Sequence, residues 1–194
     1  MKKIHNFYLL RFTLCLLIIF NLSNTTFAIS PDISIKTNEP TLRHLLEIAI
    51  QPVGKTMYVW GGGWNEADTG AGVEAVSIGV SPQWEEFFNQ QDSTYNYQST
   101  RYQIHDGLDC SGYIGWTLYN LFHSQNGEDR YVMKAKDMAK SFSNYGWGIY
   151  NTVETVQDFR PGDIMSSNQG HVYLVVGCCS DGSIVLLHSS PPGV

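Results

Sequence analysis

The spacing of apolar positions changes along the chain from a helical period to a strand-like one. After Pro40, apolar residues recur at helical spacing at Leu42, Leu45, Leu46, Ala49 and Ile50. Asp109 fits a helix N-cap, and a second helical stripe follows it at Tyr113, Ile114, Leu118, Leu121 and Phe122. Shorter helices are predicted near 83–90 and over 134–142.

The strand-like pattern lies near the end of the chain. Residues 171–177 and 184–188 are rich in apolar side chains, and a Cys-Cys-Ser-Asp-Gly-Ser link between them predicts a hairpin. Residues 57–60 form a short extended piece that runs into three consecutive glycines. Because the helices come first and the strands last, we expect an α+β fold.

Two stretches fit neither period. Residues 64–108 scatter aromatic side chains among Gln, Asn, Ser and Thr, and we interpret them as a long surface excursion with one short helix. At the start of the chain, a basic pair precedes an apolar run at 12–20 and a Thr-Phe-Ala sequence. The run is about half of the ~20 residues that a membrane anchor needs, so residues 1–28 are expected to be a signal peptide. A flexible leader over 29–39 and one domain over 40–194 would follow.

Composition and charge narrow the classes of function. Apolar residues make up 43% of the chain and aromatic residues 13%, which is enough to bury a core. From residue 29 onward there are 18 acidic and 9 basic residues, a balance of 18 − 9 = 9 negative charges. Nucleic-acid binders neutralise phosphates with clustered basic residues, so we expect no nucleic-acid partner.

The cysteines point to one candidate nucleophile. Cys110, Cys178 and Cys179 follow the signal segment, and an odd number excludes a complete set of internal disulfides. Cys110 would lie in the first turn of the helix capped by Asp109, where the helix dipole favours a thiolate and main-chain N–H groups could hold an oxyanion. The alternative is a buried structural cysteine, which is the more common situation for a free thiol.

A thiol nucleophile needs a base, and His171 is the best placed histidine. It follows a Gln-Gly turn and heads an apolar strand, so its ring projects from a rigid element at a sheet edge. His188 ends the return strand as its only polar side chain. A lone histidine in an apolar strand is more often a core residue unless it has a partner.

The length of the hairpin loop decides whether the two histidines meet. A two-residue turn would set His188 opposite Val175, roughly 13 Å along the strand from His171. Ser190 would then lie opposite Tyr173, close to His171, in place of His188. A loop over 179–182 would set His188 opposite Tyr173, roughly 7 Å from His171 on the same face. Two imidazoles can bridge the shorter distance, so this register and His188 are favoured.

Five short motifs together resemble the NlpC-type cysteine peptidases of bacterial cell walls. They are Tyr58-Val59-Trp60-Gly61-Gly62, Asp109-Cys110-Ser111-Gly112-Tyr113, Arg160-Pro161-Gly162-Asp163-Ile164, Gly170-His171-Val172 and Leu187-His188-Ser189. The resemblance implies a papain-like core in which N-terminal helices pack on a small antiparallel sheet. It also implies a cysteine peptidase that hydrolyses peptidoglycan stem peptides, commonly at the bond from γ-D-glutamate to a diamino acid.

The resemblance also implies a role for each matching residue. Cys110 would be the nucleophile, His171 the base, and His188 the residue that orients the base. Tyr58 would lie near the thiol, and Asp109 and Ser111 would line the subsite for the free amino end of the stem peptide. No cofactor is implied, and no metal is expected, because the sequence has no His/Asp/Glu cluster at ligand spacing.

The chain departs from this family at three places. Residues 64–108 are an insertion where the family has few residues, and the loop between the histidines is longer than usual. The chain also ends soon after the last motif, which indicates either a fragment or a trimmed C-terminal edge. The insertion is expected to wall one side of the substrate cleft.

Two other functions remain open at the level of sequence. One is a CHAP-type amidase or endopeptidase of the cell wall, whose cysteine motif usually lacks the Asp-Cys-Ser-Gly form. The other is a non-catalytic wall-binding module. In each case we expect an exported protein of the bacterial cell envelope, without a membrane span once the signal is removed; the sequence leaves the oligomeric state open.

Overall fold

The computed structural model describes residues 40–122 and 131–194, and the predicted signal peptide and leader lie outside these ranges. The described elements, in chain order, are α2 (Leu42–Ala49), β1 (Met57–Tyr58), the 3-10 helix η1 (Glu74–Val76), α3 (Pro82–Asn89), β2 (Gly107–Leu108), α4 (Cys110–Phe122), α5 (Ala135–Asn144), β3 (Ile164–Ser166), β4 (Val172–Cys178) and β5 (Ile184–Leu187). The order confirms an α+β fold. Across both ranges, no helix combines the length and the apolar character that crossing a membrane requires.

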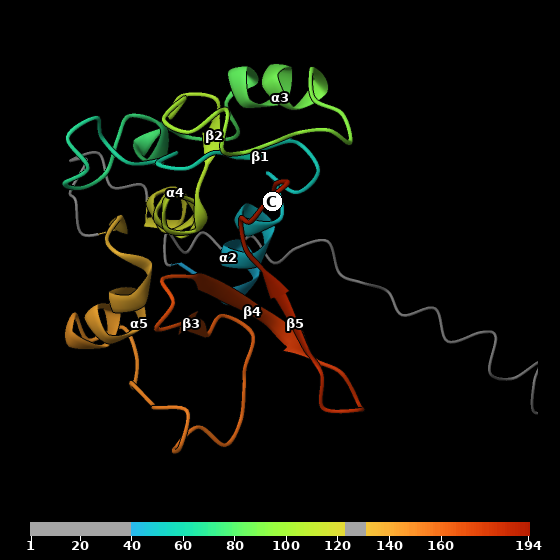
Figure 1. Cartoon of the computed structure of the whole chain (residues 1–194). Coiled ribbons are helices and arrows are strands. Elements are labelled where there is room, and N and C mark those ends of the chain that lie inside the picture. Colours follow the sequence, from blue (N-terminus) through green and yellow to red (C-terminus); the bar gives the residue numbers. More distant parts are fainter. Residues whose placement is uncertain (1–39, 123–130) are drawn as a thin grey trace, which may run out of the picture. The chain divides into compact units, whose positions relative to one another are not determined.

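Helix α4 is the centre of the core. It contacts α2, η1, α5 and β4, and Figure 1 shows it between the three-stranded sheet on one side and the segment carrying α3 on the other. The helix predicted after Asp109 is confirmed, and every residue from Cys110 to Leu121 is buried, so it is enclosed on all sides and not only along the predicted apolar stripe. The polar side chains of this helix are paired internally: Thr117 Oγ1 donates to the Tyr113 carbonyl at 2.8 Å, and Asn120 Nδ2 donates to the Trp116 carbonyl at 2.9 Å.

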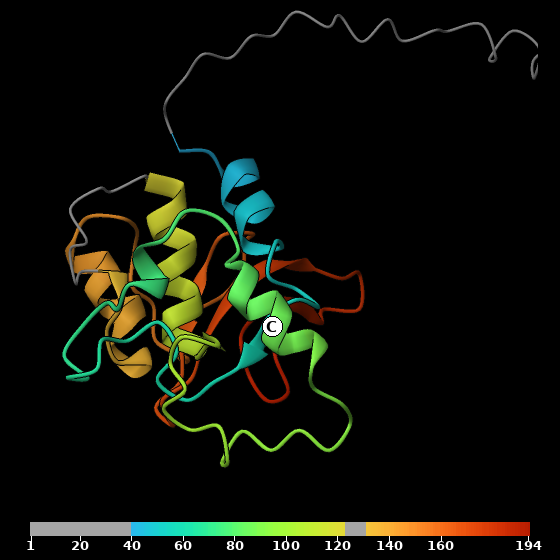
Figure 2. The same ribbon diagram turned by 90° about the horizontal axis from the view of Figure 1, so that it is seen from above.

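The other helices lie close to their predicted ranges. Helix α2 is capped by Thr41, whose hydroxyl accepts a hydrogen bond from the His44 N–H, and it buries Leu45, Ile48 and Ala49. The predicted stripe is therefore rotated, because Leu42 and Ile50 are 48% and 61% exposed while Ile48 lies inside. Figure 1 shows α3 on the opposite side of α4 and β1 from the sheet of β3, β4 and β5, and in Figure 2, seen from above, α3 lies in front of that sheet.

The described strands form two small sheets, one of two strands and one of three. Strands β1 and β2 pair in parallel, with Tyr58 opposite Leu108, and β3, β4 and β5 form an antiparallel sheet in that order. Strands β2 and β3 were not predicted, because runs of two or three residues show no recognisable alternation. The last residues of the chain line the free edge of β1: the Tyr58 N–H donates to the Pro192 carbonyl at 2.9 Å.

The loop of the β4–β5 hairpin differs from both predicted lengths. The Cys179 N–H donates to the Ser183 carbonyl at 2.8 Å and closes a loop of three residues, 180–182. Gly182 ends this loop with a φ of +84°, the left-handed conformation that three-residue hairpin loops require at this place.

A β-bulge then corrects the register. Leu174 pairs with Leu187, but between Val175 and Gly177 the pairing shifts, which leaves Val176 as an extra residue in β4. Continued by one residue, this pairing sets His188 opposite Tyr173. The predicted neighbourhood of His188 is therefore confirmed, although a bulge and not a four-residue loop produces it.

Candidate active site

The start of α4 is fixed by direct contact between main chains. The Asp109 N–H donates to the Gly62 carbonyl at 2.9 Å, and a Cβ atom added to Gly112 would lie 2.0 Å from that same carbonyl oxygen. The space beside Gly112 is thus occupied by the glycine turn of residues 61–63. Glycine is required here because two main chains touch.

Asp109 caps α4, as predicted. Its Oδ1 accepts the Gly112 N–H at 2.7 Å and the Ser111 hydroxyl at 2.8 Å. Burial of the carboxyl group raises the pKa of Asp109 to about 6, although these hydrogen bonds act in the opposite direction. Near neutral pH the site therefore holds a carboxylate directly before the candidate nucleophile.

Ser111 forms a hydrogen bond that holds the Asp109 carboxylate in position. It is buried, its hydroxyl hydrogen is directed to Asp109, and its oxygen accepts the indole N–H of Trp64 at 2.9 Å. The predicted place of Ser111 in a substrate subsite is thus taken up by contacts within the protein. Trp64 was missed by sequence reasoning, and its one signal was an indole N–H that needs a partner once it is partly buried.

Cys110 is almost enclosed, with 7% of its surface exposed. Its Sγ lies 3.9 Å from the Gly170 carbonyl oxygen, and the Val172 N–H is also directed at the sulfur. Burial, with a smaller contribution from the Asp109 charge, raises the pKa of the Cys110 thiol to about 12. The main-chain N–H groups at the start of α4 favour the thiolate, as expected, but burial outweighs them and favours the protonated thiol.

The two histidines of the hairpin meet. His171 Nε2 and His188 Nδ1 are 2.8 Å apart, and the two rings are almost perpendicular. Because Nε2 of His171 is engaged, its Nδ1 is the nitrogen that remains for the thiol. The sulfur contacts the main chain on both sides of His171, at residues 170 and 172, so the structure brings Cys110, His171 and His188 into one cluster.

Both imidazoles are partly buried, and their charged forms are disfavoured. Burial lowers the pKa of His171, and the nearby His188 lowers it further; burial alone lowers the pKa of His188. Tyr173 packs against both rings, at 4.6 Å from the ring centre of His171 and 5.1 Å from that of His188. Because both pKa values are lowered, both imidazoles are neutral at neutral pH, and His171 can accept a proton.

Ser189 was not proposed as a site residue from the sequence, yet it links the chain just after β5 to Leu108, the last residue of β2. Its side chain is buried and donates a hydrogen bond of 2.7 Å to the carbonyl of Leu108. Leu108 directly precedes Asp109, so the residue after His188 and the residue before the N-cap are tied together. A serine flanked by polar residues gave no sequence signal of this long-range contact.

Tyr58 lies beside the same cluster. Its phenol is buried, and burial is the main reason why its pKa is raised, with further contributions from the charges of Asp109 and Cys110. The phenol therefore stays protonated and can donate a hydrogen bond. This places Tyr58 near the thiol, as predicted.

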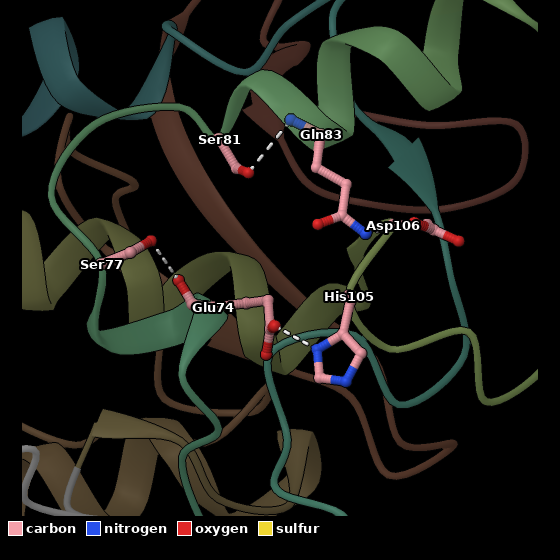
Figure 3. A network of polar contacts seen from close by, with 6 residues as sticks. All are labelled: Glu74, Ser77, Ser81, Gln83, His105 and Asp106. Atoms are coloured by element: carbon pink, nitrogen blue, oxygen red, sulfur yellow. Dashed lines mark hydrogen bonds and ion pairs between the residues drawn. The ribbon is translucent and has the colours of Figure 1, made fainter.

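His105 is engaged elsewhere. Its Nδ1 contacts the Glu74 carboxylate, which raises the pKa of His105, and Figure 3 shows the pair pointing toward each other between η1 and the chain before β2. The neighbouring Asp106 accepts a hydrogen bond from Gln83 Nε2 at 2.9 Å. These contacts lie within the 64–108 segment and tie its earlier part, at η1 and α3, to the residues directly before β2.

Within residues 40–122 and 131–194, no group of three or more His, Cys, Asp or Glu side chains is placed to hold a metal ion. Comparison of the chain with protein-family models, with curated proteins and with solved structures found no match. The geometry of the Cys110 cluster and the five motifs are therefore what bears on function.

Proposed function

We propose that this protein is a papain-like cysteine peptidase of the NlpC type that hydrolyses peptide bonds in peptidoglycan stem peptides. The observation that carries the proposal is the 2.8 Å contact between His171 and His188, beside a cysteine sulfur that lies against the main chain flanking His171. A nucleophile, a base and a group that orients the base are the parts that acyl transfer by a thiol requires.

The resting protonation states define the first step. The thiol of Cys110 carries its proton and the His171 imidazole is neutral, so Nδ1 of His171 accepts that proton as the sulfur attacks the scissile carbonyl carbon. His171 Nε2–H donates to His188 Nδ1, which keeps the base in the required tautomer. As the tetrahedral intermediate collapses, the C–N bond breaks and His171 returns the proton to the leaving amine.

The main chain at the start of α4 would stabilise the oxyanion. The N–H groups of Cys110 and Ser111 favour negative charge at the sulfur, so they are directed at the space where the reaction takes place. Water then attacks the thioester, His171 accepts a proton from it, and the acyl product and the free thiol are released.

The substrate specificity follows from the charges beside the thiol. The Asp109 carboxylate would attract the free amino end of a stem peptide, and the oxygen of the neutral Tyr58 phenol could accept a hydrogen bond from it. Ser111 and Trp64 would act on substrate indirectly, because their polar groups hold Asp109 in place. We propose the bond from γ-D-glutamate to the diamino acid as the scissile bond, and export guided by residues 1–28 as the route to the cell envelope.

The test is hydrolysis of the stem tripeptide L-Ala-γ-D-Glu-diamino acid, followed by mass spectrometry. Cys110→Ser should lower kcat by at least about 10³-fold, because an alcohol lacks both the nucleophilicity and the acidity of a thiol. Cys179→Ser is the matched control, since this thiol is exposed at the hairpin loop, and it should leave turnover unchanged.

Three results would contradict the proposal. Near-normal activity of Cys110→Ser would exclude Cys110 as the nucleophile. Equal loss in both serine variants would point to a general effect of removing thiols. A wild-type protein that binds peptidoglycan without cleaving it, with a Cys110 thiol inert to alkylation, would favour the wall-binding module with a structural cysteine.

A further inference from the structure

The end of the 64–108 insertion is fastened along the strand that carries Tyr58. The Tyr95 hydroxyl donates to the Tyr58 carbonyl at 2.5 Å, and the Tyr102 N–H donates to the Trp60 carbonyl at 3.2 Å. The ring of Tyr97 meets the ring of Tyr58 edge-on, with centres 5.6 Å apart. Residues 95–102 thus run beside Tyr58, whose phenol is affected by the charge of Cys110.

Arg101 is held within this segment by two aromatic rings. Its Cζ lies 4.6 Å from the ring centre of Trp60 and 5.2 Å from that of Tyr102. Both rings are accessible, at 44% and 69% exposed, and Tyr102 adopts a left-handed φ of 72°, which is uncommon for an aromatic residue. The two rings restrain the guanidinium in one orientation.

The guanidinium has no acidic partner within residues 40–122 and 131–194. Among the residues that the structure describes, no carboxylate forms an ion pair with Arg101, whose side chain is exposed. Its positive charge nevertheless acts on the Tyr58 phenol, which is also close to Asp109 and Cys110. An unpaired cation with five N–H donors therefore lies at the rim of the reaction site.

We propose that Arg101, clamped by Trp60 and Tyr102, is a carboxylate-binding site that receives the free α-carboxylate of the glutamyl residue at the scissile bond. The inference rests on the proposed function. In a γ-linked glutamate the side-chain carboxyl forms the peptide bond, so the α-carboxylate stays free, a short aliphatic stem away from the reacting carbonyl. A planar guanidinium matches this group with two parallel hydrogen bonds.

Two charged side chains of the site would then each pair with an opposite charge on the substrate. Asp109 attracts the free amine of the stem peptide, and Arg101 attracts the glutamyl α-carboxylate. Amidation of that carboxylate removes the charge and one acceptor, so the protein should discriminate against amidated stems. The insertion would thereby supply specificity that the five short motifs do not contain.

The experiment compares two peptides, L-Ala-γ-D-Glu-diamino acid and its glutamyl α-amide, in hydrolysis and in binding. Binding is measured by calorimetry with the Cys110→Ser variant, so that it does not depend on turnover. The α-carboxylate peptide should be favoured by about 10- to 100-fold in both kcat/KM and affinity, the size expected for a charged hydrogen-bonded pair.

Arg101→Gln should remove this preference by weakening the carboxylate peptide alone. Arg101→Lys should retain part of it, because lysine keeps the charge and the contact with the rings but loses the planar fork. Arg43→Gln is the matched control, since it removes an exposed arginine from α2, and it should change neither peptide.

Equal binding of the two peptides by the Cys110→Ser variant would overturn the carboxylate site, as would a preference that survives Arg101→Gln. A loss of both peptides together in Arg101→Gln and Arg101→Lys would also overturn it, because it would show a purely structural role. A preference in binding that depends on Arg101, without hydrolysis of either peptide by the wild type, would support the carboxylate site and overturn only the proposed hydrolysis.

Discussion

The two sides of the candidate site are built by different means. On the nucleophile side, glycine main chains touch one another and the side chains around Cys110 are buried. On the side of the 64–108 segment, the aromatic and arginine side chains of residues 95–102 are partly or fully exposed, and hydrogen bonds join this stretch to the main chain of Tyr58 and Trp60. The first construction leaves the main chain little room to move, whereas the second can change its side chains without altering the backbone. We therefore expect chemistry to depend on the first side and selectivity on the second.

The largest effect should come from filling the contact between the glycine turn and α4. In Gly112→Ala the new Cβ would lie 2.0 Å from the Gly62 carbonyl oxygen, and neither main chain can move without shifting Asp109 and Cys110. We expect the free energy of unfolding to fall by about 3 kcal/mol or more, measured by urea denaturation, together with the loss of hydrolysis.

Gly148→Ala is the control for this change. A Cβ atom there would meet no other atom within 4 Å, and the φ angle of Gly148 is not left-handed. The control should be neutral or slightly stabilising. Equal stability of the two variants would show that the contact at Gly112 relaxes easily and that the nucleophile side is no more rigid than the insertion.

The sequence predicted the residues of the nucleophile side better than their surroundings. Asp109 could be recognised as a cap because its partner Gly112 is three residues away, and such local contacts leave a pattern. The contact of Trp64 with Ser111 spans 47 residues and that of Ser189 with Leu108 spans 81, and neither leaves a periodic signal.

The hairpin shows the same limit in another form. The position of His188 depends on the sum of a loop length and a bulge, and each contributes one residue to the register. Counting residues in the loop alone could not separate them.

The ionisation of Cys110 was also beyond the sequence. It depends on how deeply the sulfur is buried, which the position of a cysteine in a helix does not reveal.

An intermediate effect is expected at His188, which would act through His171 and not on substrate. His188→Ala should lower kcat by about 10- to 100-fold with little change in KM, because the base loses the partner that fixes its tautomer. His188→Gln should be milder, since its amide oxygen can still accept a hydrogen bond from His171 Nε2. Steady-state kinetics on the stem tripeptide separate the two parameters.

The pH profile distinguishes this role from simple packing. Burial and the nearby His188 hold the pKa of His171 below 6.5, so wild-type activity should persist below that pH and be lost as the pH falls through the lowered value. Removing His188 admits water beside His171, which reduces the burial that lowers its pKa, and it also removes the smaller lowering contribution of the nearby His188; both changes raise the pKa of His171. The acid limb of kcat should therefore move to higher pH in His188→Ala; an unchanged limb would show that His188 does not act on the base.

The smallest effect should be found where the two sides meet, at the hydrogen bond from Trp64 in the insertion to Ser111 in α4. Trp64→Phe keeps an aromatic ring but removes the indole N–H, so the Ser111 hydroxyl loses its donor while it still donates to Asp109. The net value of one such hydrogen bond is about 1 kcal/mol, which corresponds to a decrease of about fivefold in kcat/KM if all of it is used in positioning Asp109.

A double-mutant cycle with Ser111→Ala isolates this contact. If the insertion acts on the nucleophile side through this hydrogen bond, the two changes together should cost about 1 kcal/mol less than the sum of the single changes, in both unfolding and kcat/KM. Additive losses would mean that the two sides operate independently. In that case selectivity at Arg101 could be altered without any effect on Cys110, and the division of labour between the two sides would be complete.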